Sequence, residues 1–191
     1  MSNKGIFSPK DVKFLMDFEQ YPMLGQLELI QTQNITTAQS SVIFSNLQND
    51  KYQVHFLIAS NYHPATNDRL GMQFFESGTL ESGSVYHIAY RYGYYSSSFG
   101  HNKSTSSNHI KICPDEEDDT GDSSSGYCYI YNAADPNQYT FTTQQMVGTD
   151  YFRFGGGCLP QKSVVDGIKL FGDDNGQDFT GTFSLYGIRF T

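Results

Sequence analysis

Hydrophobic and polar residues alternate with a period of two along most of the chain after residue 25. One apolar face formed in this way comprises Tyr52, Val54, Phe56 and Ile58, and another comprises Ile88, Tyr90 and Tyr92. Successive side chains of a β-strand point to opposite faces, so this period predicts strands that each bury one side. Clusters of Gly, Asn, Asp, Ser and Pro separate the alternating segments, as turns do between strands.

The alternation predicts about eleven short strands with no helix between them. The predicted strands are 27–32, 41–44, 51–60, 70–77, 85–94, 109–113, 127–131, 139–143, 151–154, 165–171 and 182–190. The glycines at 155–157 and the Asp-rich segment 173–176 are interpreted as turns, and the low-complexity stretches 96–107 and 113–126 as surface loops. Residues 26–191 are therefore expected to form one all-β domain, an antiparallel β-sandwich of jelly-roll type.

Residues 1–25 differ from the rest and are interpreted as an N-terminal arm. Ser8 and Pro9 are suited to the start of a helix, and apolar residues then follow at helical spacing, which predicts a short helix ending before Pro22. An isolated helix of this length is marginal in water, so we expect the arm to pack either on the chain's own sandwich or on a neighbouring subunit or other protein, and we favour the neighbour. The apolar arm residues expected to bind this partner are Phe7, Val12, Phe14, Leu15, Phe18 and Tyr21.

Charge and composition exclude several classes of protein. The chain has 12 Lys and Arg against 20 Asp and Glu, a net charge of −8, whereas nucleic-acid binding needs clustered positive charge. No apolar run approaches the ~18 residues that a membrane span needs, and the N-terminus lacks the pattern of a secretion signal. The three cysteines, Cys113, Cys128 and Cys158, form no CxxC pair and are expected to be buried free thiols. The sequence thus favours a soluble protein without nucleic-acid partners.

Six acidic residues are concentrated between positions 115 and 122. A calcium site is one interpretation, but Ser123 and Tyr129 stand where the helix–loop–helix calcium pattern requires glycine and glutamate. A solvent-exposed loop without a tightly bound metal is favoured, although weak calcium binding stays open.

Neutralising this acidic loop is expected to change the stability little. Replacement of Glu116, Glu117, Asp118 and Asp119 by Asn or Gln should alter the free energy of unfolding by at most about 0.5 kcal/mol per site, because exposed substitutions seldom do more. Thermal melts with and without calcium test this expectation. A large rise in melting temperature on adding calcium, lost in the substituted protein, would contradict it.

The sequence contains no recognisable catalytic motif. No G-x-S-x-G motif occurs, and Cys158 has no histidine close to it in the sequence. His55 and His87 lie in alternating segments, where a structural role is expected, and the only dense carboxylates lie on the acidic loop, whereas glycosidases hold theirs at a fixed separation. We therefore assign no catalytic residue, cofactor or metal site, and expect a protein that is not an enzyme.

An aromatic-rich segment follows residue 85 and offers a possible binding surface. Exposed tyrosines on a jelly roll can stack on sugar rings, but alternation directs half of the rings into the core, and tyrosine is also enriched at subunit interfaces. A core or interface role is favoured, and a glycan platform is the alternative. The aromatic residues assigned to either role are Tyr92, Tyr94, Tyr95 and Phe99.

Three segments carry a resemblance to a known group of proteins. Residues 163–171 read SVVDGIKLF and residues 181–188 read GTFSLYGI, and the upstream segment 44–67 holds FSNL, YQVHF and NYHPATN. This arrangement resembles jelly-roll structural proteins of tailed bacteriophages, over roughly residues 26–191. In this pattern Asp166-Gly167 is expected to form a turn or bulge before an apolar strand, and the last strand is expected to fill the core with Phe183, Leu185 and, after a bulge at Gly187, Ile188 and Phe190.

The resemblance implies a non-enzymatic virion protein. Such a protein would be attached to the capsid or tail through its N-terminal arm, with the sandwich facing outward, and would be a homo-oligomer whose partners are other virion proteins. The resemblance does not distinguish the capsid from the tail. The alternative is a carbohydrate-binding or host-receptor-recognition module, whose partner would be a glycan on the host surface.

Overall fold

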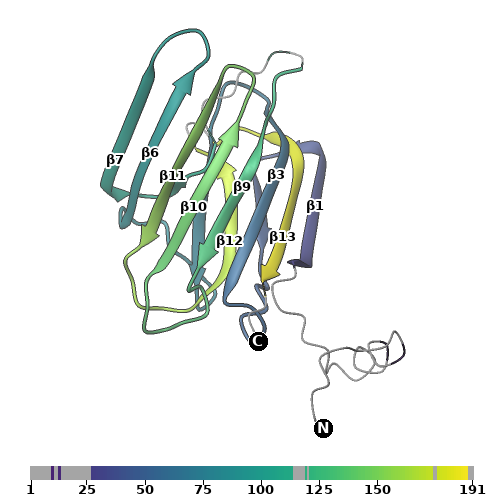
Figure 1. Cartoon of the computed structure of the whole chain (residues 1–191), viewed down its shortest axis with the longest axis vertical. Helices are drawn as coiled ribbons and strands as arrows, with labels where there is room; N and C mark the ends of the chain where they lie inside the picture. The colour runs from purple at the N-terminus through teal and green to yellow at the C-terminus, as the bar shows by residue number, and fades with distance from the viewer. Residues whose placement is uncertain are drawn as a thin grey trace.

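The structure, a computed structural model, describes residues 27–113, 119, 121–173 and 176–188, together with residues 10 and 13. Between residues 27 and 188 the described chain is folded into β-strands joined by turns and loops, and these strands form two antiparallel sheets (Figure 1). The eight strands of the large sheet lie in the order β1 (Leu27–Gln39), β13 (Phe179–Ile188), β3 (Val54–Pro64), β9 (Ser124–Tyr131), β10 (Thr140–Val147), β11 (Tyr151–Leu159), β6 (Tyr86–Tyr94) and β7 (Phe99–Ser107). The small sheet contains β2 (Ser41–Phe44), β12 (Val165–Gly172), β4 (Leu70–Glu76) and β5 (Thr79–Leu80), with β8 (Ile110–Lys111) also paired to β4.

The strand order confirms the predicted jelly-roll sandwich. The order β1-β13-β3-β9 in one sheet and β2-β12-β4-β8 in the other is that of the eight-stranded jelly roll. Two additional hairpins, β6–β7 and β10–β11, lengthen the large sheet beyond β9. We call these four added strands the extension.

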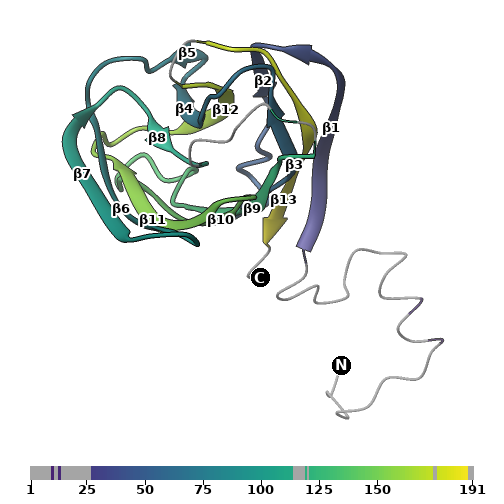
Figure 2. The same cartoon turned by 90° about the horizontal axis from the view of Figure 1, so that it is seen from above.

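The core lies between the sheets, because the large sheet curves around the small one (Figure 2). Strand β13 alternates strictly between buried and half-buried residues, and its Phe179, Phe183 and Leu185 are completely buried. They meet buried residues of the small sheet such as Phe74 and Leu170 in one hydrophobic cluster. Each such side chain stabilises the fold by roughly 1.5–3 kcal/mol relative to exposure.

Two predicted loops are wrong because they contain strands. Residues 99–107 form β7, which pairs with β6 at the edge of the large sheet. An edge strand beyond the core buries little, so residues 101–107 of this strand are all polar and lack the alternation of a core strand. Likewise, Ser124 is completely buried at the start of β9 although it lies in a polar run, because β9 passes between β3 and β10.

The predicted turn at residues 155–157 is also wrong, since these glycines lie inside β11. A Cβ atom on Gly155 would lie 2.5 Å from the Ala89 carbonyl oxygen, and one on Gly157 would lie 3.0 Å from the Ile110 side chain. The glycines are thus required by close packing within and beneath the sheet and do not reverse the chain.

Of the two strand irregularities predicted near Gly167 and Gly187, the structure contains only the first. The pairing of β12 with β4 is irregular between Val165 and Gly167, which shows that the turn or bulge predicted at Asp166-Gly167 is a bulge. The pairing of β13 is regular through Gly187, so the bulge predicted at that glycine is wrong. Ile188 therefore lies half-buried on the outer face, and Tyr52, predicted in a strand with Val54, precedes β3 and packs over Gly187.

The predicted helix of the arm falls outside the described residues, apart from the isolated residues 10 and 13. It stays a prediction. All three cysteines are free, as expected, and Cys113 and Cys128 are buried, but the burial predicted for Cys158 is wrong because this residue is only half-buried. His55 has the structural role predicted for it, because it is buried and its Nε2 lies 2.7 Å from the Leu47 carbonyl oxygen.

A buried ion-pair cluster joins the segment before β8 to the end of β12. His109 Nε2 lies 2.7 Å from Asp173 Oδ1, and Lys111 Nζ lies 3.2 Å from Asp173 Oδ2. Asp173 was assigned to a turn from sequence, but its side chain is only 6% exposed. Burial alone would raise the pKa of the Asp173 carboxyl, but the hydrogen bond from His109 and the charges of His109 and Lys111 outweigh burial and hold the pKa below its usual value.

We expect Asp173→Asn to lower the free energy of unfolding by about 3 kcal/mol at neutral pH, because it leaves the Lys111 ammonium and the His109 imidazole without their anionic partner. The folded-state pKa is depressed, so the stabilisation is present above the unfolded pKa of about 4 and is lost as the pH falls below it. Melting curves between acidic and neutral pH test this. The difference between wild type and variant should shrink in acid, and the exposed control Asp50→Asn should show no such loss. Equal melting temperatures for wild type and Asp173→Asn at neutral pH would contradict the expectation.

Candidate functional site

The outer face of the large sheet, turned away from the core, is unusually poor in charge. Strand pairing defines rows of neighbouring side chains that cross this face. The central row contains Leu29, Tyr186, Phe56, Tyr129, Thr143, Gly156, Ala89 and Lys103, and the next row contains Thr32, Ser184, Ile58, Tyr127, Gln145, Phe154, Arg91 and His101. Neither row contains an acidic residue, although the chain as a whole carries a net charge of −8.

Aromatic side chains cover the part of this face formed by β13, β3 and β9. We call this set the aromatic band, and it consists of Phe56, Tyr127, Tyr129, Tyr131 and Tyr186. The Phe56 ring lies 4.6 Å from that of Tyr129, measured between ring centroids, and Tyr129 and Tyr131 are stacked at 6.1 Å with an interplanar angle of 22°. Since the rings pack on one another, the band is a continuous apolar surface with hydroxyl groups at its edge.

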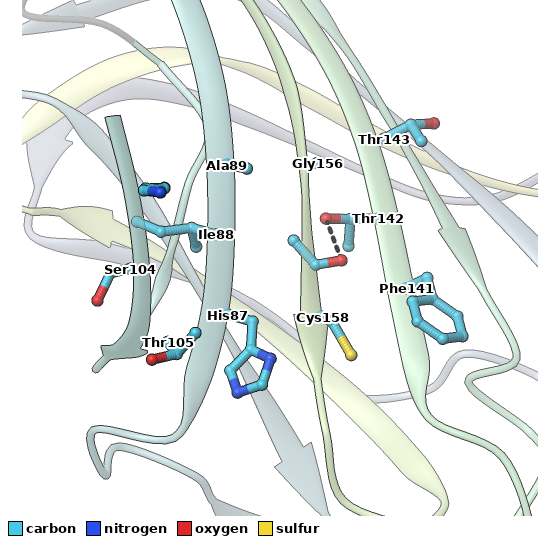
Figure 3. Close-up of a pocket in the computed structure, with 12 residues that line it drawn as sticks. His87, Ile88, Ala89, Ser104, Thr105, Phe141, Thr142, Thr143, Gly156 and Cys158 are labelled. Carbon is cyan, nitrogen blue, oxygen red and sulfur yellow. Dashed lines mark hydrogen bonds between the residues drawn. The ribbon is translucent and has the colours of Figure 1, made fainter. Parts of the chain in front are cut away.

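A groove adjoins the aromatic band on the outer face of the extension (Figure 3). Its volume is about 790 Å³, and residues of all four strands of the extension line it. Its floor is low because Ala89 and Gly156 carry little or no side chain, and a Cβ atom on Gly156 would lie 2.7 Å from the Thr142 carbonyl oxygen. Phe141 stands at one side, whereas Lys103 lines the opposite side on β7. Two smaller hollows adjoin it, one towards Tyr129 and one towards Arg91.

One end of the groove brings His87 next to Cys158, which are paired across β6 and β11 (Figure 3). Burial raises the pKa of the Cys158 thiol, so at neutral pH this thiol stays protonated and is a weak nucleophile. His87 is exposed on the outer face, and the structural role expected from its place in an alternating strand stays a prediction. The groove therefore offers a mainly apolar surface, with the basic residues His87 and Lys103 at its edges.

The structure divides the four predicted aromatic site residues between two places. Tyr95 and Phe99 are 63% and 80% exposed and lie beside Phe152 near the turn between β6 and β7. Tyr92 and Tyr94 point to the inner side of β6, with their ring centroids 5.7 Å apart. The predicted glycan platform is therefore not one surface.

Tyr92 and Tyr94 line a small polar pocket of about 140 Å³ beneath the extension. Arg153 is 4% exposed in this pocket, lies 4.3 Å over the Tyr90 ring and donates from Nη1 to the Cys113 carbonyl oxygen at 2.6 Å. The Nε of Arg153 is buried without a hydrogen-bond partner. The other lining residues are Arg69, Asn102 and Tyr151.

Several predicted sites lie outside the described residues. This applies to the arm residues Phe7, Val12, Phe14, Leu15, Phe18 and Tyr21, and to most of the acidic loop, including Glu116, Glu117 and Asp118. Among the residues that the structure describes, no three His, Cys, Asp or Glu side chains gather where they could hold a metal ion. Within the same described residues, no helix is long and apolar enough to cross a membrane.

The sequence patterns do not predict the groove. They assign no function to the residues of β10 and β11 that line it, such as Phe141 and Gly156, because they place the glycines of β11 in a turn. The available signal was the alternation of exposed apolar residues with buried polar ones in β10, where Thr142 and Gln144 are buried and Phe141 is 42% exposed. An inverted pattern of this kind indicates a strand with an apolar outer face.

No protein-family model matches the chain, and no curated protein is significantly similar to it.

Proposed function

We propose that this chain is a non-enzymatic structural protein of a bacteriophage virion, which assembles with other virion proteins and with copies of itself. The observation that carries the proposal is the outer face of the large sheet, which is aromatic and free of acidic residues in the rows described above. The cores of protein interfaces are depleted in charged residues and enriched in Tyr, Phe and Arg, and large exposed apolar patches mark interaction sites.

The jelly-roll architecture supports the same proposal. This fold is common in viral capsid proteins, but it also occurs in lectin domains, so the fold alone does not decide between the two classes. The resemblance of residues 163–171 and 181–188 to phage structural proteins favours the virion role. In this proposal the arm, residues 1–25, attaches the protein to the capsid or tail.

Charged substitutions on the outer face test the proposal. Tyr127→Glu and Phe154→Glu place carboxylates on side chains that are 38% and 46% exposed, so the fold should tolerate them. We expect each to reduce incorporation into phage particles at least about ten-fold, which corresponds to roughly 1.4 kcal/mol of lost contact energy. Ile43→Glu is the matched control, because Ile43 is 45% exposed on the small sheet. Equal incorporation of all three variants and wild type would contradict the outer face as the assembly surface.

A second candidate function is recognition of an acidic glycan on a host surface. The polar pocket beneath the extension favours it, because tyrosine rings and hydroxyls suit a sugar, and the guanidinium of Arg153 suits a carboxylate. Titration with sialic acid, glucuronic acid and neutral glucose, followed by NMR, tests this candidate. Saturable binding of the acidic sugars, lost in Tyr94→Ala and Asn102→Ala, would favour receptor recognition. Absence of binding would remove this candidate.

A further inference from the structure

The groove on the extension leaves a mostly apolar surface uncovered. Its floor at Ala89 and Gly156 is flanked by Phe141 on one side and, through an adjoining hollow, by Phe154 on the other. Phe141 and Phe154 are 42% and 46% exposed. A groove with small residues on its floor and aromatic rings beside it accepts protruding apolar side chains from another segment.

The N-terminal arm leaves the sandwich at the same end of the same face. Strand pairing places Leu27, the first residue of β1, in one row across the sheet with Ile188, Val54, Tyr131, Phe141, Cys158 and His87. The groove is lined by the last three of these. Leu27 and Leu29 are 51% and 58% exposed, so apolar surface extends from the point where the arm departs.

The arm and the groove are complementary in chemistry. Residues 14–25 hold seven large apolar side chains, Phe14, Leu15, Met16, Phe18, Tyr21, Met23 and Leu24. The only charged residues in this part of the arm are Asp17 and Glu19. The charged residues beside the groove are Arg91 and Lys103, with no acid in the groove lining. Residues 14–25 are therefore apolar and acidic, whereas the groove is apolar and basic, so the two are complementary.

We infer that the groove of one copy binds residues 14–25 of a second copy of this chain. The inference rests on the proposed assembly role and narrows it, because it identifies the surface to which the arm attaches as the groove of a neighbouring copy. Each copy carries one arm and one groove, so the contact joins copies either reciprocally in a two-fold dimer or head-to-tail in a ring or filament. Burial of the apolar arm side chains drives this contact against the cost of ordering the segment.

The full-length chain carrying Ala89→Glu tests the inference. Ala89 is exposed and points outward from β6, so the substitution fills the groove and adds a negative charge without entering the core. Light scattering after gel filtration should show an oligomer for wild type and a monomer for Ala89→Glu. Ile43→Glu, on the other sheet, should keep the wild-type mass.

A synthetic peptide of residues 1–25 gives an independent readout on the full-length protein. Excess peptide should dissociate the wild-type oligomer, and labelled peptide should bind Ala89→Glu at least ten-fold more weakly than it binds the Ile43→Glu control. A monomeric wild type, or an Ala89→Glu protein that keeps both its oligomeric mass and its affinity for the peptide, would overturn the inference. If the chain is nonetheless found in virions, the assembly role stands and only the binding site for the arm is wrong.

Discussion

Phage particles assembled with a chain that lacks residues 1–25 are expected to contain at least about ten-fold less of this protein than wild-type particles. The truncation removes the apolar arm but no residue of the described core, which extends from Ile35 to Leu185. Because a short amphipathic segment is marginal by itself in water, its stabilisation must come from the surface on which it packs. Loss of several buried side chains at roughly 1.5–3 kcal/mol each should therefore abolish attachment.

The truncated protein must itself remain folded for this result to have meaning. We expect a soluble protein with the strand-rich circular dichroism spectrum and a melting temperature close to that of wild type. Quantitative immunoblotting of purified particles measures incorporation, with Ile43→Glu as a full-length control. Normal incorporation of the truncated chain would show that the arm is not the attachment element, and failure of the truncated chain to fold would show that the arm belongs to the sandwich.

Gly187→Ala is expected to lower the free energy of unfolding by about 3 kcal/mol or more. Tyr52 packs directly over Gly187, so a Cβ atom there would occupy the space of the tyrosine ring. Tyr52 is 3% exposed, packs edge-on against His55 and donates a hydrogen bond to Glu28 Oε2 at 2.7 Å. Displacement of the ring therefore costs both its packing and this charge-assisted hydrogen bond.

Thermal and denaturant unfolding measure this effect. Gly83→Ala is the matched control, because a Cβ atom at Gly83 lies near only the movable side chains of Glu81 and Val85, and it should change the stability by less than about 1 kcal/mol. In a Tyr52→Ala background, Gly187→Ala should cost much less than in wild type, since the colliding ring is gone. A cost that is the same in both backgrounds would contradict packing of Tyr52 as the reason for the glycine.

The sequence predicted the strands of the jelly roll because these strands have one buried and one exposed face. In β13, for example, Phe183 and Leu185 are buried while Ser184 and Tyr186 are half-buried on the outer face. The extension was less predictable. Edge strand β7 buries little and has no alternation to detect, and the glycines of β11 are dictated by the close approach of Ala89 and Ile110, which only the folded chain brings near.

The groove and the aromatic band could not be predicted either, because they form only when strands distant in sequence become neighbours. The groove and the aromatic band depend on which strands are neighbours across the sheet, and β11 pairs with β6, which is about sixty residues earlier in the chain. Sequence patterns show that Phe141 and Phe154 occupy strands, but they do not show that these residues flank Gly156 and Ala89. The role of Asp173 was missed similarly, because its partner His109 is distant in sequence.

The central claim, that this chain is a structural component of a phage particle, is tested most directly by quantitative mass spectrometry of purified virions whose genome encodes it. We predict that the protein is present in every preparation at a copy number that is a multiple of the particle's capsid or tail symmetry. Its absence from purified virions, or a trace amount that varies between preparations and is lost on further purification, would contradict the claim.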